Sequence, residues 1–88
     1  MIVKDYVIMD PEGIHARPAT ALVRLVKKFK SAISLKKDKK VIRLDSMINI
    51  LSMCAKGGET ISIIIEGQDE VSAGEAIDLF FTEQLGNL

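Results

Sequence analysis

The residues best suited to chemistry in this sequence lie in one short segment. Residues 13–20 read Gly-Ile-His-Ala-Arg-Pro-Ala-Thr and contain His15, Arg17 and Pro18. Proline is accepted in the first turn of a helix, because the N–H group that it lacks would have no partner there. We therefore predict that a helix begins directly after His15 and that His15 is its N-cap. Because proline disfavours helical geometry in the residue before it, this cap position is defined to within one residue.

The start of a helix suits the binding of an anion. Its N–H groups lack partners within the helix, and the helix dipole places its positive end there. We expect the N–H groups of Ala16 and Arg17 to bind a phosphate, with charge-assisted hydrogen bonds from the Arg17 side chain. The same positive end opposes protonation of the His15 ring, which keeps it nucleophilic. This pattern predicts a phosphoryl acceptor; a histidine that only caps the helix is the plainer alternative.

Apolar periodicity places this segment between a strand and a helix. Ile2–Met9 is rich in β-branched and apolar residues, and residues 10–13 have turn chemistry. Ala16–Phe29 has apolar residues at three- and four-residue spacings, which predicts a helix with one buried face. That face consists of Ala19, Leu22, Val23, Val26 and Phe29.

The rest of the chain predicts a hairpin, a short helix, a strand and a last helix. The ranges are 32–44 for the hairpin, Met47–Met53 for the short helix, Thr60–Glu66 for the strand and Glu70–Leu85 for the last helix, which Gly86 ends. The apolar stripe of the last helix contains Val71, Ala73, Ile77, Phe80, Phe81 and Leu85. Gly74 inside this helix costs about 0.5 to 1 kcal/mol relative to alanine.

The predicted order of elements is β-α-β-β-α-β-α. Strands with one apolar face need cover on that face only, so we expect an α+β fold with three helices on one side of a four-stranded sheet. A length of 88 residues, 48% hydrophobic residues and zero formal net charge indicate one globular domain, residues 1–88. So small a domain has no deep cleft, so its chemistry is expected on the surface.

Composition also limits the location and the cofactors that we expect. Cys54 is the only cysteine, which excludes an internal disulfide and, without a Cys/His ligand set, a structural zinc site. The acid at Asp5 interrupts what would be the apolar part of a signal peptide, and no apolar run is long enough for a membrane span. We expect a cytoplasmic protein without metal, cofactor or membrane insertion.

The segment 13–20 closely resembles the active-site signature of the histidine-containing phosphocarrier (HPr) family of the bacterial phosphoenolpyruvate-dependent sugar phosphotransferase system. Chain length, element order and the region of Ser46 extend the resemblance over the whole chain. The resemblance implies an open-faced β-sandwich with an antiparallel sheet. It also implies that His15 accepts a phosphoryl group on Nδ1 from enzyme I and passes it to sugar-specific enzyme II components. Arg17 would balance the phosphoryl charge, and the protein would be a substrate of its partner enzymes, not itself an enzyme.

A docking face is predicted on the first two helices. Arg17, Arg24, Lys27 and Lys28 share one stripe of the first helix, and a basic stripe attracts an acidic partner. The seven residues of the short helix cannot all face inward, so we expect some of its apolar residues at the surface. The predicted partner-binding residues are Thr20, Arg24, Lys27, Met47, Ile48 and Leu51. An ordinary solvated helix face is the alternative.

Ser46 precedes the short helix, where a serine caps the first turn. The resemblance adds a regulatory role, because a serine kinase phosphorylates the matching serine in one branch of the family. The phosphorylated form then acts with a catabolite-control transcription regulator. Asp45 and Asn49 differ from the lysine and glycine usual in that branch, and Asp45 should weaken the kinase contact. Glu12 also stands where small polar residues are frequent in the family, and it would oppose a phosphoryl charge on His15 or favour the protonated ring.

Two other functions compete with the sugar-system carrier. A regulatory or nitrogen-related phosphorelay protein would keep the histidine chemistry but use different partners. A nucleic-acid-binding domain is suggested by the run Lys36-Lys37-Asp38-Lys39-Lys40. Zero net charge and the lack of an aromatic stacking set on the strands speak against nucleic acid.

Overall fold

The computed structural model describes residues 1–9, 13–14, 16–53 and 56–85. The strands are β1 (Ile2–Val7), β2 (Ala32–Lys37), β3 (Lys40–Arg43) and β4 (Thr60–Glu66). The helices are α1 (Ala16–Val26), α2 (Met47–Met53) and α3 (Glu70–Leu79), and α3 continues as the π-helical turn η1 (Phe80–Leu85). The predicted order β-α-β-β-α-β-α is confirmed.

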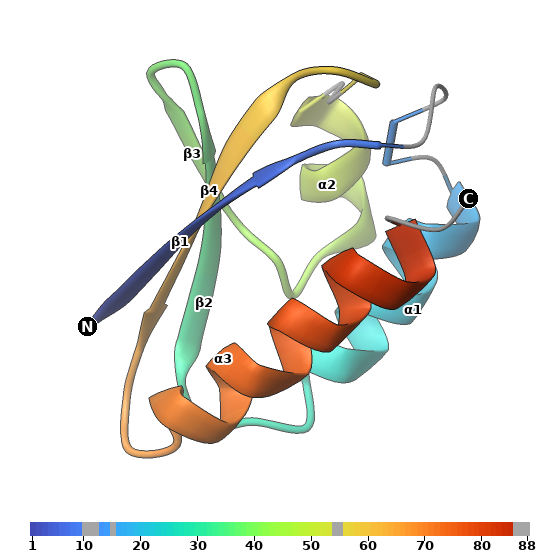
Figure 1. Ribbon diagram of the computed structural model, residues 1–88. Coiled ribbons are helices and arrows are strands. Elements are labelled where there is room, and N and C mark those ends of the chain that lie inside the picture. The colour runs from blue at the N-terminus through green and yellow to red at the C-terminus, as the bar shows by residue number, and fades with distance from the viewer. Residues whose placement is uncertain (10–12, 15, 54–55, 86–88) are drawn as a thin grey trace.

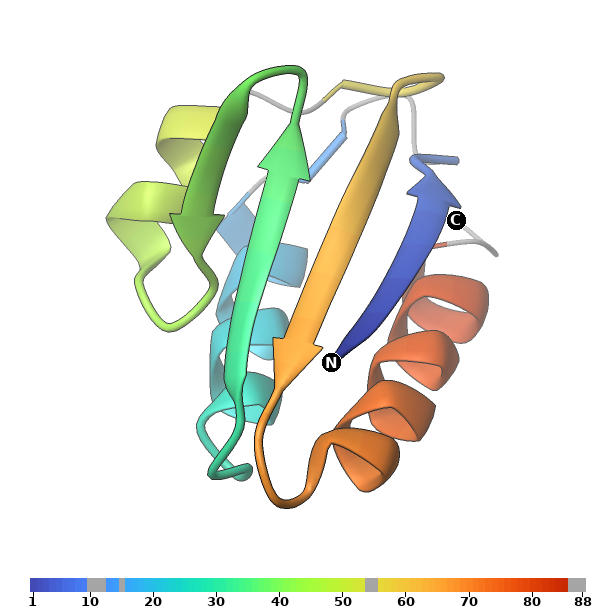
Figure 2. The same ribbon diagram turned by 90° about the vertical axis from the view of Figure 1, so that its left-hand side faces the viewer.

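The four strands form one antiparallel sheet in the order β1-β4-β2-β3. All three helices lie on one face of it, and the other face is open (Figures 1 and 2). In β4 the side chains alternate between the two faces, so that Ile61, Ile63 and Ile65 are buried. Val3 and Val41 lie on outward positions of the edge strands and are 55% and 54% exposed. The predicted open-faced arrangement is therefore confirmed.

The core lies between the sheet and the helices. The central strands contribute Ile33, Leu35, Ile61, Ile63 and Ile65, and α1 contributes Ala19, Leu22, Val23 and Val26. From α3 and η1 come Ala73, Ile77, Phe80 and Phe81. Val71 was predicted to belong to this apolar stripe and is 65% exposed, so that prediction is wrong. It lies in the first turn of α3, and its side chain points away from the sheet.

Two helix ends differ from the sequence prediction. The helix α1 ends at Val26 instead of Phe29, because the N–H groups of Lys28 and Phe29 bond to the carbonyl oxygens of Leu25 and Val26, three residues back. This tighter bonding ends the α-helix. Phe29 still packs against the core. Gly86, the predicted end of the last helix, lies outside the described residues.

The α-helical part of the last helix ends at Leu79, not at Leu85. In the wider turn η1, Phe80 and Phe81 are consecutive and both buried, with ring centroids 5.3 Å apart in an edge-to-face arrangement. Phe81 also stacks on Tyr6 at 4.5 Å. A π-helical turn rotates less per residue than an α-helix, which lets two neighbouring rings face the core together.

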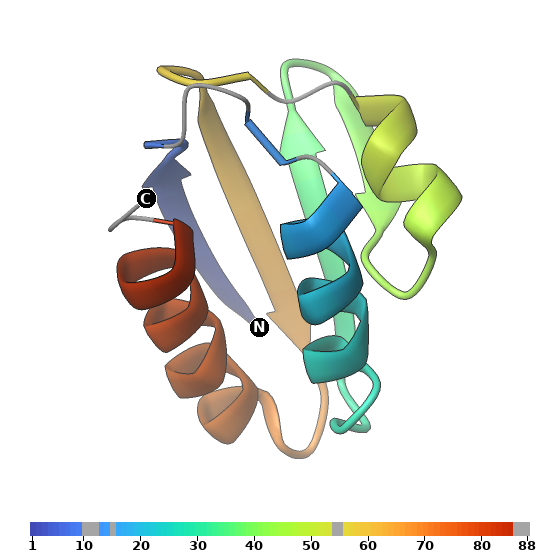
Figure 3. The same cartoon turned by 90° about the vertical axis from the view of Figure 1, so that its right-hand side faces the viewer.

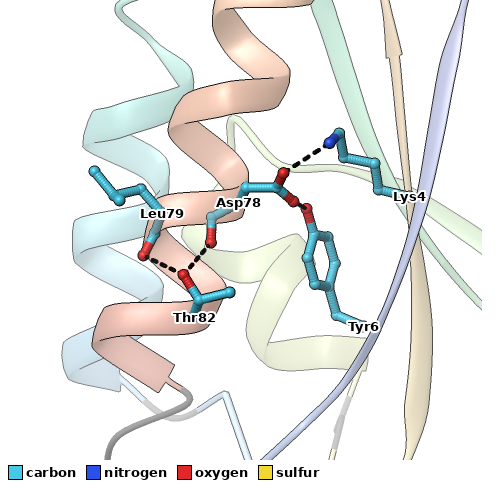
Figure 4. Close-up of polar contacts among 5 residues, drawn as sticks. All are labelled: Lys4, Tyr6, Asp78, Leu79 and Thr82. Carbon is cyan, nitrogen blue, oxygen red and sulfur yellow. Dashed lines mark hydrogen bonds and ion pairs between the residues drawn. The ribbon is translucent and has the colours of Figure 1, made fainter.

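A carboxylate joins the last helix to the edge strand β1. Asp78 accepts hydrogen bonds from the Lys4 ammonium at 2.8 Å and from the Tyr6 hydroxyl (Figure 4). The Thr82 hydroxyl lies 2.8 Å and 3.4 Å from the carbonyl oxygens of Asp78 and Leu79. Burial, and then the bond to Asp78, raise the pKa of Tyr6, while the bonds from Lys4 and Tyr6 lower the pKa of Asp78. This cluster holds α3 against β1.

A second carboxylate closes the opposite end of the sheet. Asp69 accepts hydrogen bonds from the N–H groups of Lys30 at 2.8 Å and Ser31 at 2.9 Å, and also from the Ser31 hydroxyl. These bonds, led by that of the Ser31 hydroxyl, lower the pKa of Asp69. Gly67 lies against the same residue, since a Cβ atom on it would be 2.6 Å from the Ser31 Cα. The loop before α3 is thus packed tightly on the start of β2.

We expect Gly67→Ala to destabilise the protein by about 2 kcal/mol or more, because the methyl group would meet backbone atoms that cannot move aside. Gly58→Ala is the matched control: Gly58 also has a positive φ, of 87°, but nothing lies within 4 Å of its Cβ position. There the backbone penalty alone, about 1 to 2 kcal/mol, is expected. Urea unfolding of both variants measures the difference. Equal or smaller destabilisation in Gly67→Ala would show that the contact with Ser31 is not restrictive.

Asp69 makes stability depend on pH with a defined sign. Its pKa is lower in the folded protein than in the unfolded chain, so its contribution is complete above the unfolded value of about 3.9 and is lost as the pH falls through the folded value. Asp69→Asn should therefore be less stable than the native chain at neutral pH, and the gap should close in acid. Urea unfolding across this range tests it, with the exposed Asp38→Asn as control. A gap that does not change with pH would contradict the assignment.

Candidate functional site

The site predicted from the sequence lies at the start of α1. The helix begins at Ala16, as predicted. His15, its capping role and Glu12 lie outside the described residues. On one side of this position, Gly13 has a φ of 72°, a conformation that favours glycine, and Ile14 is buried in the core. On the other side, Pro18 is buried in the first turn of the helix. The chain is therefore anchored both before and after residue 15.

The first turn of α1 offers the groups that an anion site requires. Ala16 and Arg17 are both exposed. Their N–H groups belong to the first turn of an eleven-residue helix, where no carbonyl of the helix is in reach. The helix has no acidic residue in that turn that would oppose a negative ligand. The start of α1 can thus present backbone donors and an arginine to a phosphoryl group at the surface.

The outer face of α1 carries the predicted basic stripe. Arg17, Arg24, Lys27 and Lys28 are all exposed, while Ala19, Leu22, Val23 and Val26 face the core. Thr20 is half-buried at the side of the helix that faces α2, and its hydroxyl donates to the carbonyl oxygen of Ala16 at 2.9 Å. The Thr20 hydroxyl oxygen also lies 3.6 Å from the Met47 sulfur. Thr20 therefore marks the junction of the two helices, which Figure 3 shows side by side.

The helix α2 presents an apolar surface beside the basic stripe. Ile48 is 80% exposed and Leu51 is 43% exposed, whereas Met47 is half-buried and packs against the core. Ile50 and Met53 are buried and attach the helix to the sheet. The structure brings the predicted docking residues together as one surface across α1 and α2. We call it the carrier face; it consists of Arg17, Thr20, Arg24, Lys27, Met47, Ile48 and Leu51.

Ser46 caps α2 as predicted. The Asn49 N–H donates to its hydroxyl oxygen at 3.3 Å, and the Ile50 N–H donates to its carbonyl oxygen at 3.1 Å. Asp45 lies beside it and is 3.7 Å from the Arg43 guanidinium. Both of these side chains are about half exposed, so their ion pair is weak. Ser46 is thus half-buried and directly precedes Met47 of the carrier face.

Two features were sought in the described residues: a group of metal-ligating side chains and a helix that could span a membrane. Within residues 1–9, 13–14, 16–53 and 56–85, no group of three or more His, Cys, Asp or Glu side chains could hold a metal ion. In the same ranges, every helix is too short or too polar to span a bilayer.

Comparison with known proteins shows the family to which the chain is similar. The family model described as "PTS HPr component phosphorylation site" matches residues 2–83. The chain belongs to the HPr family. It is 36% identical over 83 residues to the phosphocarrier protein HPr of Lysinibacillus sphaericus, with 94% of each chain covered. HPr proteins are phosphocarriers of the phosphotransferase system, and this chain shares that general function.

Solved structures of HPr proteins have the same fold. The histidine-containing phosphocarrier protein of Mycoplasma superposes with a TM-score of 0.92 at 32% identity, and 96% of each chain is covered. The Bacillus subtilis catabolite repression protein Crh, described as a domain-swapped dimer, superposes with a TM-score of 0.75 at 28% identity; 94% of this chain and 95% of Crh are covered. The HPr fold predicted from the sequence is therefore confirmed.

One surface feature of this HPr protein was not predicted. A groove lies between α1 and the α3–η1 helix, and Leu79, which is 57% exposed, forms part of its wall. The sequence does contain an indication of this feature, because Leu79 falls outside the apolar stripe predicted for the last helix. An apolar residue off the buried face of a helix indicates an exposed apolar position.

Proposed function

We propose that His15 accepts a phosphoryl group from phosphorylated enzyme I and passes it to enzyme II components. The observation that carries this proposal is the start of α1 at Ala16, directly after His15, with Arg17 exposed in the first turn. Membership of the HPr family supports it, since the family model is named for a phosphorylation site. Cytoplasmic location follows from the proposed partners, because no step requires the chain to leave that compartment.

The transfer is a displacement at phosphorus. In the first step, the Nδ1 lone pair of His15 attacks the phosphorus atom of the donor, and the bond from phosphorus to the donor group breaks as the new P–N bond forms. In the second step, the acceptor group of an enzyme II component attacks, and the P–N bond breaks. His15 is then ready for another cycle. The first-turn N–H groups and Arg17 offset the charge on the phosphoryl oxygens in both steps.

The carrier face supplies recognition for both partners. Its basic residues attract acidic surfaces and raise the rate of encounter, and its exposed apolar residues add a small area of contact. A small interface binds weakly, which suits a carrier that must leave one partner before it meets the next. We propose that Thr20, Arg24, Lys27, Met47, Ile48 and Leu51 contact enzyme I and enzyme II components in turn.

Labelled phosphoenolpyruvate with enzyme I tests the carrier proposal. We expect acid-labile label on the native chain and none on His15→Ala. Arg17→Ala should slow the transfer by about 10- to 100-fold, the value of one or two charge-assisted hydrogen bonds. Arg43→Ala is the matched control, because Arg43 is also exposed but lies on β3, and its rate should stay native. Label that persists in His15→Ala, or is stable to acid, would refute the acceptor role.

We further propose that Ser46 is a site of regulation by a serine kinase. A phosphate there would be tolerated at the start of α2 but would place about two negative charges beside the carrier face. Enzyme I, if acidic, would then be repelled, and a catabolite-control transcription regulator could recognise the modified form. Asp45 adds a negative charge at the same place, and so should weaken recognition by the kinase.

The kinase reaction with ATP measures this effect directly. We expect slow phosphorylation of the native chain, faster phosphorylation of Asp45→Lys, and no phosphorylation of Ser46→Ala. The same charge change at the exposed Asp38 is the control and should leave the rate unchanged. Ser46→Ala should also lose about 1 kcal/mol of stability, since it removes the cap of α2. If Asp45→Lys is no faster than the native chain, Asp45 does not restrict the kinase.

A regulatory or nitrogen-related phosphorelay role is the second candidate. The similarity to Crh supports it, because Crh is named for catabolite repression. Transfer of label from His15 to enzyme II components favours the sugar-system carrier. Phosphorylation at His15 that no enzyme II component removes favours the relay.

A further inference from the structure

An open groove runs between α1 and the α3–η1 helix. Figure 3 shows that α3 and α2 lie on opposite sides of α1. Its volume is about 360 Å³. The residues that line it include Ala21, Arg24, Leu25, Lys28, Leu79 and Phe80. None of these residues except Arg24 belongs to the carrier face. The groove is therefore a separate surface that shares one arginine with the proposed carrier site.

The floor of the groove is apolar. Phe80 is buried, Leu25 is half-buried, and Leu79 is 57% exposed. Ala21 and Ala76 lie between them, and their small side chains leave the space unfilled. An exposed leucine in a concave apolar surface gains free energy when a partner covers it, about 25 cal/mol per Å² of apolar area.

The rim of the groove is charged, with the two signs on opposite walls. Arg24 lies on α1 and Lys28 lies in the turn that follows it; both are exposed, and Glu83 lies on η1. The opposite charges of the two walls reflect a separation of basic and acidic residues along the sequence. Residues 17–43 contain Asp38 as their only acidic residue, and residues 57–83 contain no lysine or arginine. The groove lies where the basic and acidic parts of the molecule meet.

We propose that this groove binds an amphipathic helical segment of a partner protein, with apolar side chains flanked by aspartate or glutamate. Its apolar residues would cover Leu25, Leu79 and Phe80, and its carboxylates would pair with Arg24 and Lys28. A nucleic acid fits less well, since the floor of the groove is apolar. Because Arg24 belongs to both surfaces, a segment bound here would reach the edge of the carrier face.

The binding test uses the full-length chain labelled with ¹⁵N and two synthetic helical peptides. The first has leucines at three- and four-residue spacings and glutamates at the other positions; the second has lysines in place of the glutamates. We expect the acidic peptide to shift the amide signals of Ala21, Leu25, Ala76 and Leu79 and to saturate. The basic peptide should shift none of them.

Matched variants locate the binding site. Lys28→Glu and Leu79→Asp should weaken binding of the acidic peptide by about tenfold or more. Lys39→Glu makes the same charge change on the β2–β3 turn, and Val71→Asp places the same acid on another exposed position of α3. Both controls should bind within about twofold of the native chain. Native urea unfolding curves confirm that each variant is folded.

Four results would overturn the proposal. They are the absence of saturable binding, equal binding of the two peptides, equal loss of affinity in the control variants, and the same shifts on addition of a single-stranded oligonucleotide. Groove signals that move with protein concentration alone would assign the surface to a second copy of this chain instead. His15→Ala should bind the acidic peptide normally, so failure of the groove and failure of phosphoryl transfer are distinguishable.

Discussion

The arrangement of this protein depends on the burial of only one face of its sheet. Residues alternate along β2 and β4, so Ile33, Leu35, Ile61, Ile63 and Ile65 all face the same layer of helices. Three helices share that one layer, and each must keep its opposite side in water. The outer faces of α1 and α2 are therefore available for partners, and the start of α1 comes to the surface at one end of the sheet. A domain without a deep cleft can thus still present a nucleophile, backbone donors and a recognition surface together.

Carboxylates hold this single layer of helices in place. Asp78 ties α3 to β1 through Lys4 and Tyr6, and Asp69 ties the loop before α3 to the start of β2. Figure 4 shows the first of these contacts, between α3 and β1. These contacts fix α3 against the sheet. The space between α1 and the α3–η1 helix is lined in part by the small residues Ala21 and Ala76.

The sequence predicted the features that follow from local rules. Alternation and helical spacing gave the order of elements, Pro18 placed the start of α1 at Ala16, and Ser46 capped α2 as expected. Two of the errors concern contacts that no local pattern encodes. The π-helical turn depends on two rings that must face the core together, and Asp69 binds Ser31 at a separation of 38 residues. The Val71 error has a local cause: Val71 precedes Ala73 by two residues and Ile77 by six, which places it on roughly the opposite side of an α-helix, where it is exposed.

Charge is distributed unevenly in a chain whose net charge is zero. Ten of the twelve lysine and arginine residues lie within residues 17–43, and seven of the twelve acidic residues lie within residues 57–83. A neutral molecule with separated charges still orients a charged partner at distances near the Debye length, about 8 Å at physiological salt. That orientation brings acidic surfaces to α1, where the proposed phosphoryl site begins. Since steering acts on encounter and adds little to affinity, complexes can form fast and still separate fast. Speed in both directions is what a carrier between two enzymes needs.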